Sequence, residues 1–158
     1  VYTVESFYEA NKKLKDDGLC IVFFKDSKFS NIEKYLKVMN FANFKLIDTF
    51  HLKKKKFTYK QNTTKDTTVM GECLFFFKKG SNKLKKTNKL SKEIIRDFVK
   101  NYYKTNNKST LAEIYDNGLI MTLYENDRLN DFKSSKDIFN AMLENLNKIN
   151  EREYEIKI

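Results

Sequence analysis

The chain has few or none of several residue types on which common enzyme motifs depend. Its 158 residues include no proline, no tryptophan, one histidine and two cysteines. The four glycines stand apart, at positions 18, 71, 80 and 118, so no glycine-rich loop that cradles a phosphate or a nucleotide is present. A histidine-based triad would have to be built around His51, and no nucleophile motif accompanies it. We therefore interpret His51 as a strand-end residue and assign no catalytic residue.

Cysteine usage and hydropathy bear on the compartment. Cys20 and Cys73 each lie within a hydrophobic run, the usual setting of a buried reduced thiol, and neither belongs to a metal-ligand spacing. No window approaches the roughly 20 apolar residues that cross a bilayer, and no signal-like stretch is present. We therefore expect a cytoplasmic protein with neither a membrane nor a metal as partner.

Positive charge is what the chain has in excess, and it is concentrated in one segment. The net charge is +10, yet residues 51–92 hold 13 lysines against only Asp66 and Glu72, a balance of +11. The other 116 residues have a balance of −1. An apolar content of 41% and 15% aromatics exclude global disorder. A neutral body with one basic segment indicates a surface that meets a polyanion.

The basic segment divides into two clusters that we predict to bind DNA. Lysines contact phosphates and position nucleic acid without reading its sequence, and the segment contains no arginine. Two aromatic side chains interleave with the first cluster, where each would add about 1–3 kcal/mol by stacking on an unpaired base. A hairpin of the flanking strands would bring both clusters to one end of a sheet. The alternative is a solvated lysine surface. The predicted residues are Lys53, Lys54, Lys55, Lys56, Phe57, Tyr59 and Lys60, then Lys78, Lys79, Lys83, Lys85 and Lys86.

Hydrophobic periodicity predicts an α/β order followed by helices. Up to residue 80 we expect helices over 4–15 and 30–41 and strands over 19–25, 44–52 and 71–79. The unbroken apolar run of the first strand is typical of strands covered on both faces. Beyond it we expect helices over 91–104, 110–124 and 135–149, and a possible strand in the alternating tail. The chain therefore divides into an α/β part (1–80), a basic linker (81–90) and a helical extension (91–158).

Three short motifs mark the α/β part. Leu14-Lys15-Asp16-Asp17-Gly18 ends the first helix, Ala42-Asn43-Phe44-Lys45-Leu46-Ile47 enters the second strand, and Gly71-Glu72-Cys73 opens an apolar strand with a basic end. This order resembles the second half of a class I S-adenosylmethionine-dependent methyltransferase, and more narrowly bacterial DNA methylases that modify the exocyclic amino group of adenine or cytosine. The resemblance covers about half of the chain. It implies a partial Rossmann-like sheet, mixed, whose last strand is antiparallel and lies beside the strand of Cys20.

Two motifs of that family are missing. The aromatic-x-Gly-x-Gly cofactor loop is absent, and the Asp/Asn/Ser-Pro-Pro-aromatic catalytic motif cannot exist without proline. In the family's usual order both lie upstream of residue 1. The resemblance therefore implies the C-terminal portion of a restriction–modification enzyme whose full-length form binds S-adenosylmethionine. This portion would hold no cofactor, would be inactive alone, and would have as partner the missing N-terminal half or another subunit. The alternatives are a non-catalytic nucleic-acid-binding or adaptor protein of α/β class and a structural module of a larger assembly.

Overall fold

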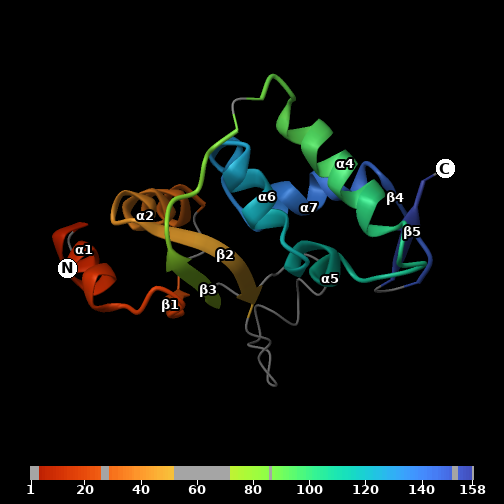
Figure 1. Cartoon of the computed structure of the whole chain (residues 1–158). Coiled ribbons are helices and arrows are strands. Elements are labelled where there is room, and N and C mark those ends of the chain that lie inside the picture. The colour runs from red at the N-terminus through yellow and green to blue at the C-terminus, as the bar shows by residue number, and fades with distance from the viewer. Residues whose placement is uncertain (1–3, 26–28, 52–71, 86, 151–152, 158) are drawn as a thin grey trace.

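The fold is a mixed α/β arrangement in which helices and two antiparallel sheets share one hydrophobic core (Figure 1). The computed structural model describes residues 4–25, 29–51, 72–85, 87–150 and 153–157. The elements of the first part agree with the expected bounds to within two residues. In chain order the elements are α1 (Val4–Lys13), β1 (Cys20–Lys25), α2 (Phe29–Phe41), β2 (Phe44–His51), β3 (Glu72–Lys79), α4 (Ser91–Tyr102), α5 (Leu111–Asp116), α6 (Leu119–Glu125), η1 (Leu129–Asp131), α7 (Ser135–Leu143), β4 (Leu146–Lys148) and β5 (Tyr154–Ile156).

The larger sheet has the strand order β1-β3-β2, and β3 runs antiparallel to both of its neighbours. It follows that β1 and β2, which are connected through α2, are parallel to each other. The prediction that the last strand is antiparallel and lies beside the strand of Cys20 is confirmed. A helical crossover between two parallel strands leaves room for a third strand between them, and β3 fills that place.

One face of this sheet is buried and the other is open. Phe75 and Phe77 of β3 and Leu46 of β2 are at most 1% exposed, and they pack in the core that α2 and α6 also line. On the outer face Ile21 and Phe23 of β1 are 53% and 54% exposed. The expectation that this strand is covered on both faces is therefore wrong for the described residues. The reason is that α2 and α6 pack on the same side of the sheet.

The helical region packs directly on the α/β part. The hydroxyl of Tyr124 in α6 donates a hydrogen bond of 3.3 Å to the carbonyl oxygen of Leu36 in α2, and both residues are buried. Core side chains of α4, α5, α6 and α7 belong to the same cluster as those of the larger sheet. None of the helices within the described ranges combines the length and the apolar character needed to cross a bilayer.

Two predicted helices differ from the structure. The helix expected over 110–124 is divided into α5 and α6 at Gly118, whose φ of 94° only glycine adopts easily. The helix expected over 135–149 ends at Leu143, because residues 146–148 form β4 and pair with the tail strand β5. The ammonium of Lys157 donates to the carbonyl oxygens of Leu143 and Glu144 at 3.2 and 3.0 Å, which satisfies the end of α7. The possible terminal strand is confirmed as β5.

Candidate nucleic-acid interface

Four of the twelve predicted DNA-binding residues lie in the described part of the chain. They are Lys78 and Lys79 at the end of β3 and Lys83 and Lys85 in the segment that follows. The other eight lie outside the described residues. Those eight are Lys53, Lys54, Lys55, Lys56, Phe57, Tyr59, Lys60 and Lys86.

The two lysines that end β3 point to opposite faces of the sheet, because successive side chains alternate along a strand. Lys79 lies on the inner side, where its ammonium forms a 3.1 Å salt bridge with the exposed carboxylate of Asp16. Lys78 is exposed on the outer face and stands directly opposite Lys45 of β2. Like charges in this position destabilise a strand pair, so sheet stability does not explain the Lys45–Lys78 pair. Sequence reasoning missed Lys45 because only the register reveals its neighbour.

The segment of residues 81–90, here called the strap, leaves the end of β3 and runs past α6 to the start of α4 (Figure 1). Over residues 81–85 its side chains alternate as they would on a strand. Asn82 is buried and Leu84 is half-buried, whereas Lys83 and Lys85 are exposed. This alternation presents both lysines to solvent on the same side of the strap.

A buried asparagine fastens the strap to the sheet. The Oδ1 atom of Asn82 accepts a 2.7 Å hydrogen bond from the backbone N–H of Leu46, and its Nδ2 donates a 3.1 Å bond to the carbonyl oxygen of Leu46. In this way the side chain imitates a neighbouring strand. The backbone N–H of Asn82 also donates to Oδ1 of Asn40 in α2 at 2.7 Å. Sequence reasoning missed both asparagines, since no local pattern separates them from the other polar residues of a lysine-rich segment.

The far end of the strap is fastened as well. The backbone N–H of Lys85 donates to the carbonyl oxygen of Glu125 at 2.7 Å, and Arg128 donates to the carbonyl oxygen of Thr87 at 3.1 Å. The ammonium of Lys89 lies 2.7 Å from a carboxylate oxygen of Asp97 in α4, and this hydrogen bond lowers the pKa of that carboxyl. The segment expected as a linker is therefore fixed against β2, α6 and α4.

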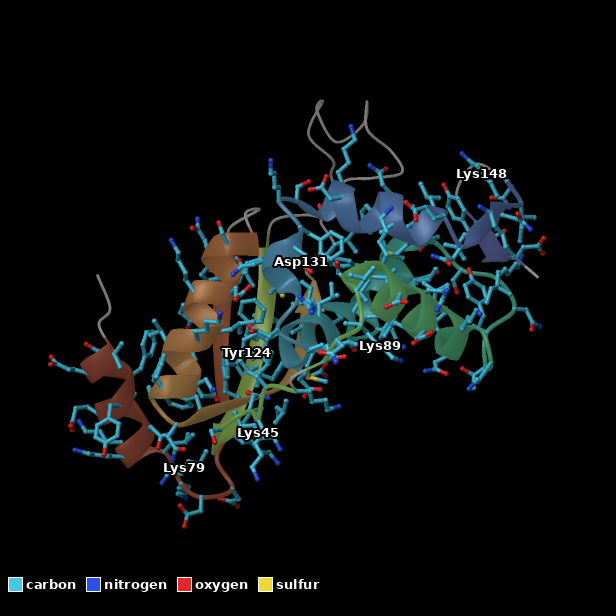
Figure 2. All side chains as sticks on the ribbon, turned by 90° about the horizontal axis from the view of Figure 1, so that it is seen from above. Lys45, Lys79, Lys89, Tyr124, Asp131 and Lys148 are labelled. Atoms are coloured by element: carbon cyan, nitrogen blue, oxygen red, sulfur yellow. The ribbon has the colours of Figure 1, made fainter. Side chains whose placement is uncertain are left out.

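These contacts fix a basic surface in place before any ligand binds. The salt bridges formed among the described residues leave Lys45, Lys78, Lys83 and Lys85 without a carboxylate partner. Figure 2 shows Lys45 and Lys79 at one end of the sheet and Lys89 farther along the same side of the molecule. Because the backbone that carries these lysines is already fixed, it loses little conformational freedom on binding a polyanion.

The register does not favour the expectation that both lysine clusters share one end of the sheet. At one end of the β2–β3 pair, Phe44 stands opposite Lys79, and at the other end His51 stands opposite Cys73. The first cluster follows His51 in the chain and lies outside the described residues. The antiparallel pairing thus separates the strand end that precedes the first cluster from the strand end that carries the second.

The two thiols lie on neighbouring strands, as expected, but not side by side. Cys20 stands opposite Phe77 and Cys73 opposite Phe24, four residues apart along β3. Both cysteines are free. Burial raises the pKa of the Cys73 thiol to about 12 and also raises that of the half-buried Cys20. Both are therefore neutral thiols at physiological pH.

This burial predicts slow labelling of Cys73. At pH 8 a pKa of about 12 in place of 9.0 lowers its thiolate fraction about a thousandfold. In a Cys20→Ser variant, we expect a thiol reagent to modify Cys73 at least about a hundredfold more slowly in buffer than in strong denaturant. The time course of labelling by mass spectrometry measures this ratio. Equal rates in the two solvents would show that Cys73 is not buried in the native chain.

Comparison with known proteins found no relative. No family model matches the chain, and searches of curated proteins and of solved structures returned no significant match. Among the described residues, no three His, Cys, Asp or Glu side chains are grouped in a way that would hold a metal ion. The candidate site is therefore defined by the strap and by the lysines at the end of the sheet.

Proposed function

We propose that this chain is the C-terminal part of a class I S-adenosylmethionine-dependent DNA amino-methyltransferase of a restriction–modification type. The observation that carries the proposal is the arrangement of three strands. Of the three strands of the larger sheet, β3 comes last in the sequence and lies antiparallel between β1 and β2. Those two strands are parallel to each other and are connected by α2. The resemblance noted in residues 4–79 implies that arrangement, and the motifs at Gly18 and Asn43 stand where it requires them, just before β1 and β2.

The proposal gives the open parts of the sheet a partner, namely the missing N-terminal half or a second subunit. Strand β1 is an edge strand, and its outer face exposes Ile21 and Phe23. Phe50 of β2 is 49% exposed on the same face. An edge strand beside an exposed apolar patch is typical of an interface. A larger Rossmann-like sheet would continue beyond the edge of β1, and the helices that accompany its strands would cover the patch.

Lysines of the strap and of the end of the sheet would hold DNA. Lys83 and Lys85 on the strap and the Lys45–Lys78 pair on the sheet are exposed. The hydrogen bonds of Asn82 to Leu46 fix the backbone of the strap to β2. Lysine ammonium groups contact phosphates and give affinity without reading bases. S-adenosylmethionine is not assigned to this chain, because the isolated glycines offer no loop for it. The chain would thus contribute DNA binding and completion of the fold.

Duplex DNA binding by the chain is the first expected result. Fluorescence anisotropy of a labelled duplex, titrated at several salt concentrations, should give a log–log slope that corresponds to roughly four or more released counterions. A triple variant, Lys78→Gln with Lys83→Gln and Lys85→Gln, should reduce that slope by about 2–3. The matched control replaces three exposed lysines of α2 and the start of α7. It carries Lys34→Gln, Lys133→Gln and Lys136→Gln. Absence of binding at low salt would exclude the DNA-holding role.

Methyl transfer separates the enzyme from the alternative, a non-catalytic nucleic-acid-binding or adaptor protein of α/β class. The reading frame upstream of Val1 should encode an aromatic-x-Gly-x-Gly loop and a Pro-Pro-aromatic motif. The product of that longer frame should transfer labelled methyl groups from S-adenosylmethionine to DNA, and this chain alone should transfer none. If the chain binds DNA and the upstream motifs are absent, that result would favour the nucleic-acid-binding or adaptor function, with the strap lysines as its DNA contacts.

A further inference from the structure

The excess of positive charge continues past the predicted segment into α4. Residues 78–108 hold eleven lysines and arginines against only Glu93 and Asp97, a balance of +9. Residues 109–158 have the opposite character, with six basic and ten acidic residues, a balance of −4. The change of sign follows the end of the α4 region, so the charge belongs to this part of the fold rather than to the composition of the whole chain.

Three of these charges form a row on the exposed face of α4. The buried face of the helix carries Ile94, Ile95 and Val99. Lys92, Arg96 and Lys100 follow one another at intervals of four residues, and all three are exposed. Four residues of α-helix rise about 6 Å, so the three charges extend over about 12 Å of the helix axis.

The structure of α4 does not account for this row. Like charges four residues apart destabilise a helix, so the row is unfavourable for α4 itself. The two acids of the helix have other partners, since Glu93 accepts from the backbone N–H of Leu90 at 2.8 Å and Asp97 binds Lys89 at 2.7 Å. Lys92 forms a 2.6 Å salt bridge with Glu144, in which both side chains are more than half exposed. An exposed pair of this kind contributes little to stability.

The remaining two cations of the row are weakly paired or unpaired. The Nε atom of Arg96 lies 3.8 Å from Asp97, beyond hydrogen-bonding distance, and no carboxylate of the described residues pairs with Lys100. The row also adjoins the strap, because the Lys89–Asp97 contact holds the end of the strap against α4. A long polyanion bound along the strap would therefore reach the row.

We propose that Lys92, Arg96 and Lys100 of α4 form a second phosphate-contacting surface, which continues the grip of the strap on duplex DNA. The inference rests on the proposed role of the strap lysines in holding DNA. Phosphates follow one another at about 3.4 Å of axial rise on each strand, so a 12 Å row along the duplex axis spans about four to five phosphates. The guanidinium of Arg96 suits a phosphate because its planar fork donates two parallel hydrogen bonds.

The test compares two variants of the whole chain that lose the same charge. The row variant carries Lys92→Gln, Arg96→Gln and Lys100→Gln, and the control is the triple variant of Lys34, Lys133 and Lys136 already described. Lys133 and Lys136 of the control lie where α7 begins, at the opposite end of that helix from Glu144, which pairs with Lys92 of the row. Thermal unfolding followed by circular dichroism establishes that both variants are folded. The anisotropy titration with the labelled duplex is then repeated over the same salt range.

We expect the row variant to lower the log–log slope by about 2–3 and the control to change it by less than about 1. Equal losses in the two variants would overturn the inference, because net charge alone would then explain them. An unchanged slope in the row variant would overturn it while the strap variant still supported the proposed function. If the row variant kept duplex binding but lost binding to fluorescent polyglutamate, the surface would be one for an acidic polypeptide, which also overturns the inference.

Discussion

Phe75→Ala is expected to destabilise the chain by about 3–5 kcal/mol, a large part of the 5–15 kcal/mol that holds an ordinary domain together. Phe75 lies on the central strand β3 and is fully buried. The centre of its ring lies 5.7 Å from that of Phe24 in β1 and 6.2 Å from that of Tyr35 in α2. Phe75 therefore packs β3 against both β1 and α2. Alanine would leave a cavity that these rings can fill only in part. Urea unfolding followed by circular dichroism measures the loss.

Phe23→Ala is the matched control for this experiment. It removes the same ring from the outer face of the neighbouring strand, where Phe23 is 54% exposed. We expect a loss of about 1 kcal/mol or less, since much of its surface already meets water. If Phe23→Ala were as damaging as Phe75→Ala, the assignment of the buried and the open face would be wrong. In a complete enzyme the proposed partner covers the outer face, so there the effect of Phe23→Ala would be larger.

Asn82→Ala is expected to destabilise the chain by about 2–4 kcal/mol, although a single polar side chain in a lysine-rich segment is removed. The substitution leaves the buried N–H and carbonyl oxygen of Leu46 without partners, and each unsatisfied group costs about 1–3 kcal/mol. Asn88→Ala, at an exposed position of the same strap, should change stability by less than about 0.5 kcal/mol. Urea unfolding of both variants gives the comparison. Equal effects would show that Asn82 does not fasten the strap.

Asn82→Asp adds a dependence on pH to the same test. The carboxylate would still accept from the N–H of Leu46, but its other oxygen would face the carbonyl oxygen of Leu46 with no proton to donate. Burial and this repulsion raise the pKa of the new carboxyl in the folded state above its value in the unfolded chain. A raised pKa in the folded state favours the protonated form, so the variant should be closest to the parent chain below about pH 4. The loss in its free energy of unfolding, relative to the parent chain, should grow as the pH rises through the folded-state pKa.

The α/β part was predictable because its signals are local. The strand of residues 20–25 is an unbroken apolar run, and Gly18 stops the helix before it. The start of α5 is local as well, since Thr110 and Glu113 form a capping box with hydrogen bonds of 3.2 and 2.9 Å between them. Helix α7 begins after Ser134, whose backbone N–H donates to the carboxylate of Asp137 at 2.9 Å. Caps and apolar runs are decided by residues within one turn of each other, which sequence patterns report well.

The departures have long-range causes. The apolar spacing of Leu146 and Ile149 continues the pattern of α7, yet residues 146–148 pair with β5. Leu146 and Tyr154 are both buried by that pairing, and a helix could not bury them together with the tail. The break at Gly118 is the exception with a local cause, since its φ of 94° ends α5 and begins α6. Tertiary burial overrides propensity in segments of this length.

The candidate site likewise has features that the sequence predicts and features that depend on long-range contacts. Composition alone located the basic segment between residues 51 and 92 and the absence of a glycine-rich loop, because charge and residue type are properties of the sequence. Only the tertiary structure paired Lys45 with Lys78, turned Lys79 to Asp16, and used Asn82 to hold the strap against Leu46. Strand register and buried hydrogen bonds join residues more than thirty positions apart, and no local pattern encodes such pairs. The sequence thus determined how much charge the surface carries, and the fold decided which lysines are fixed together and face solvent.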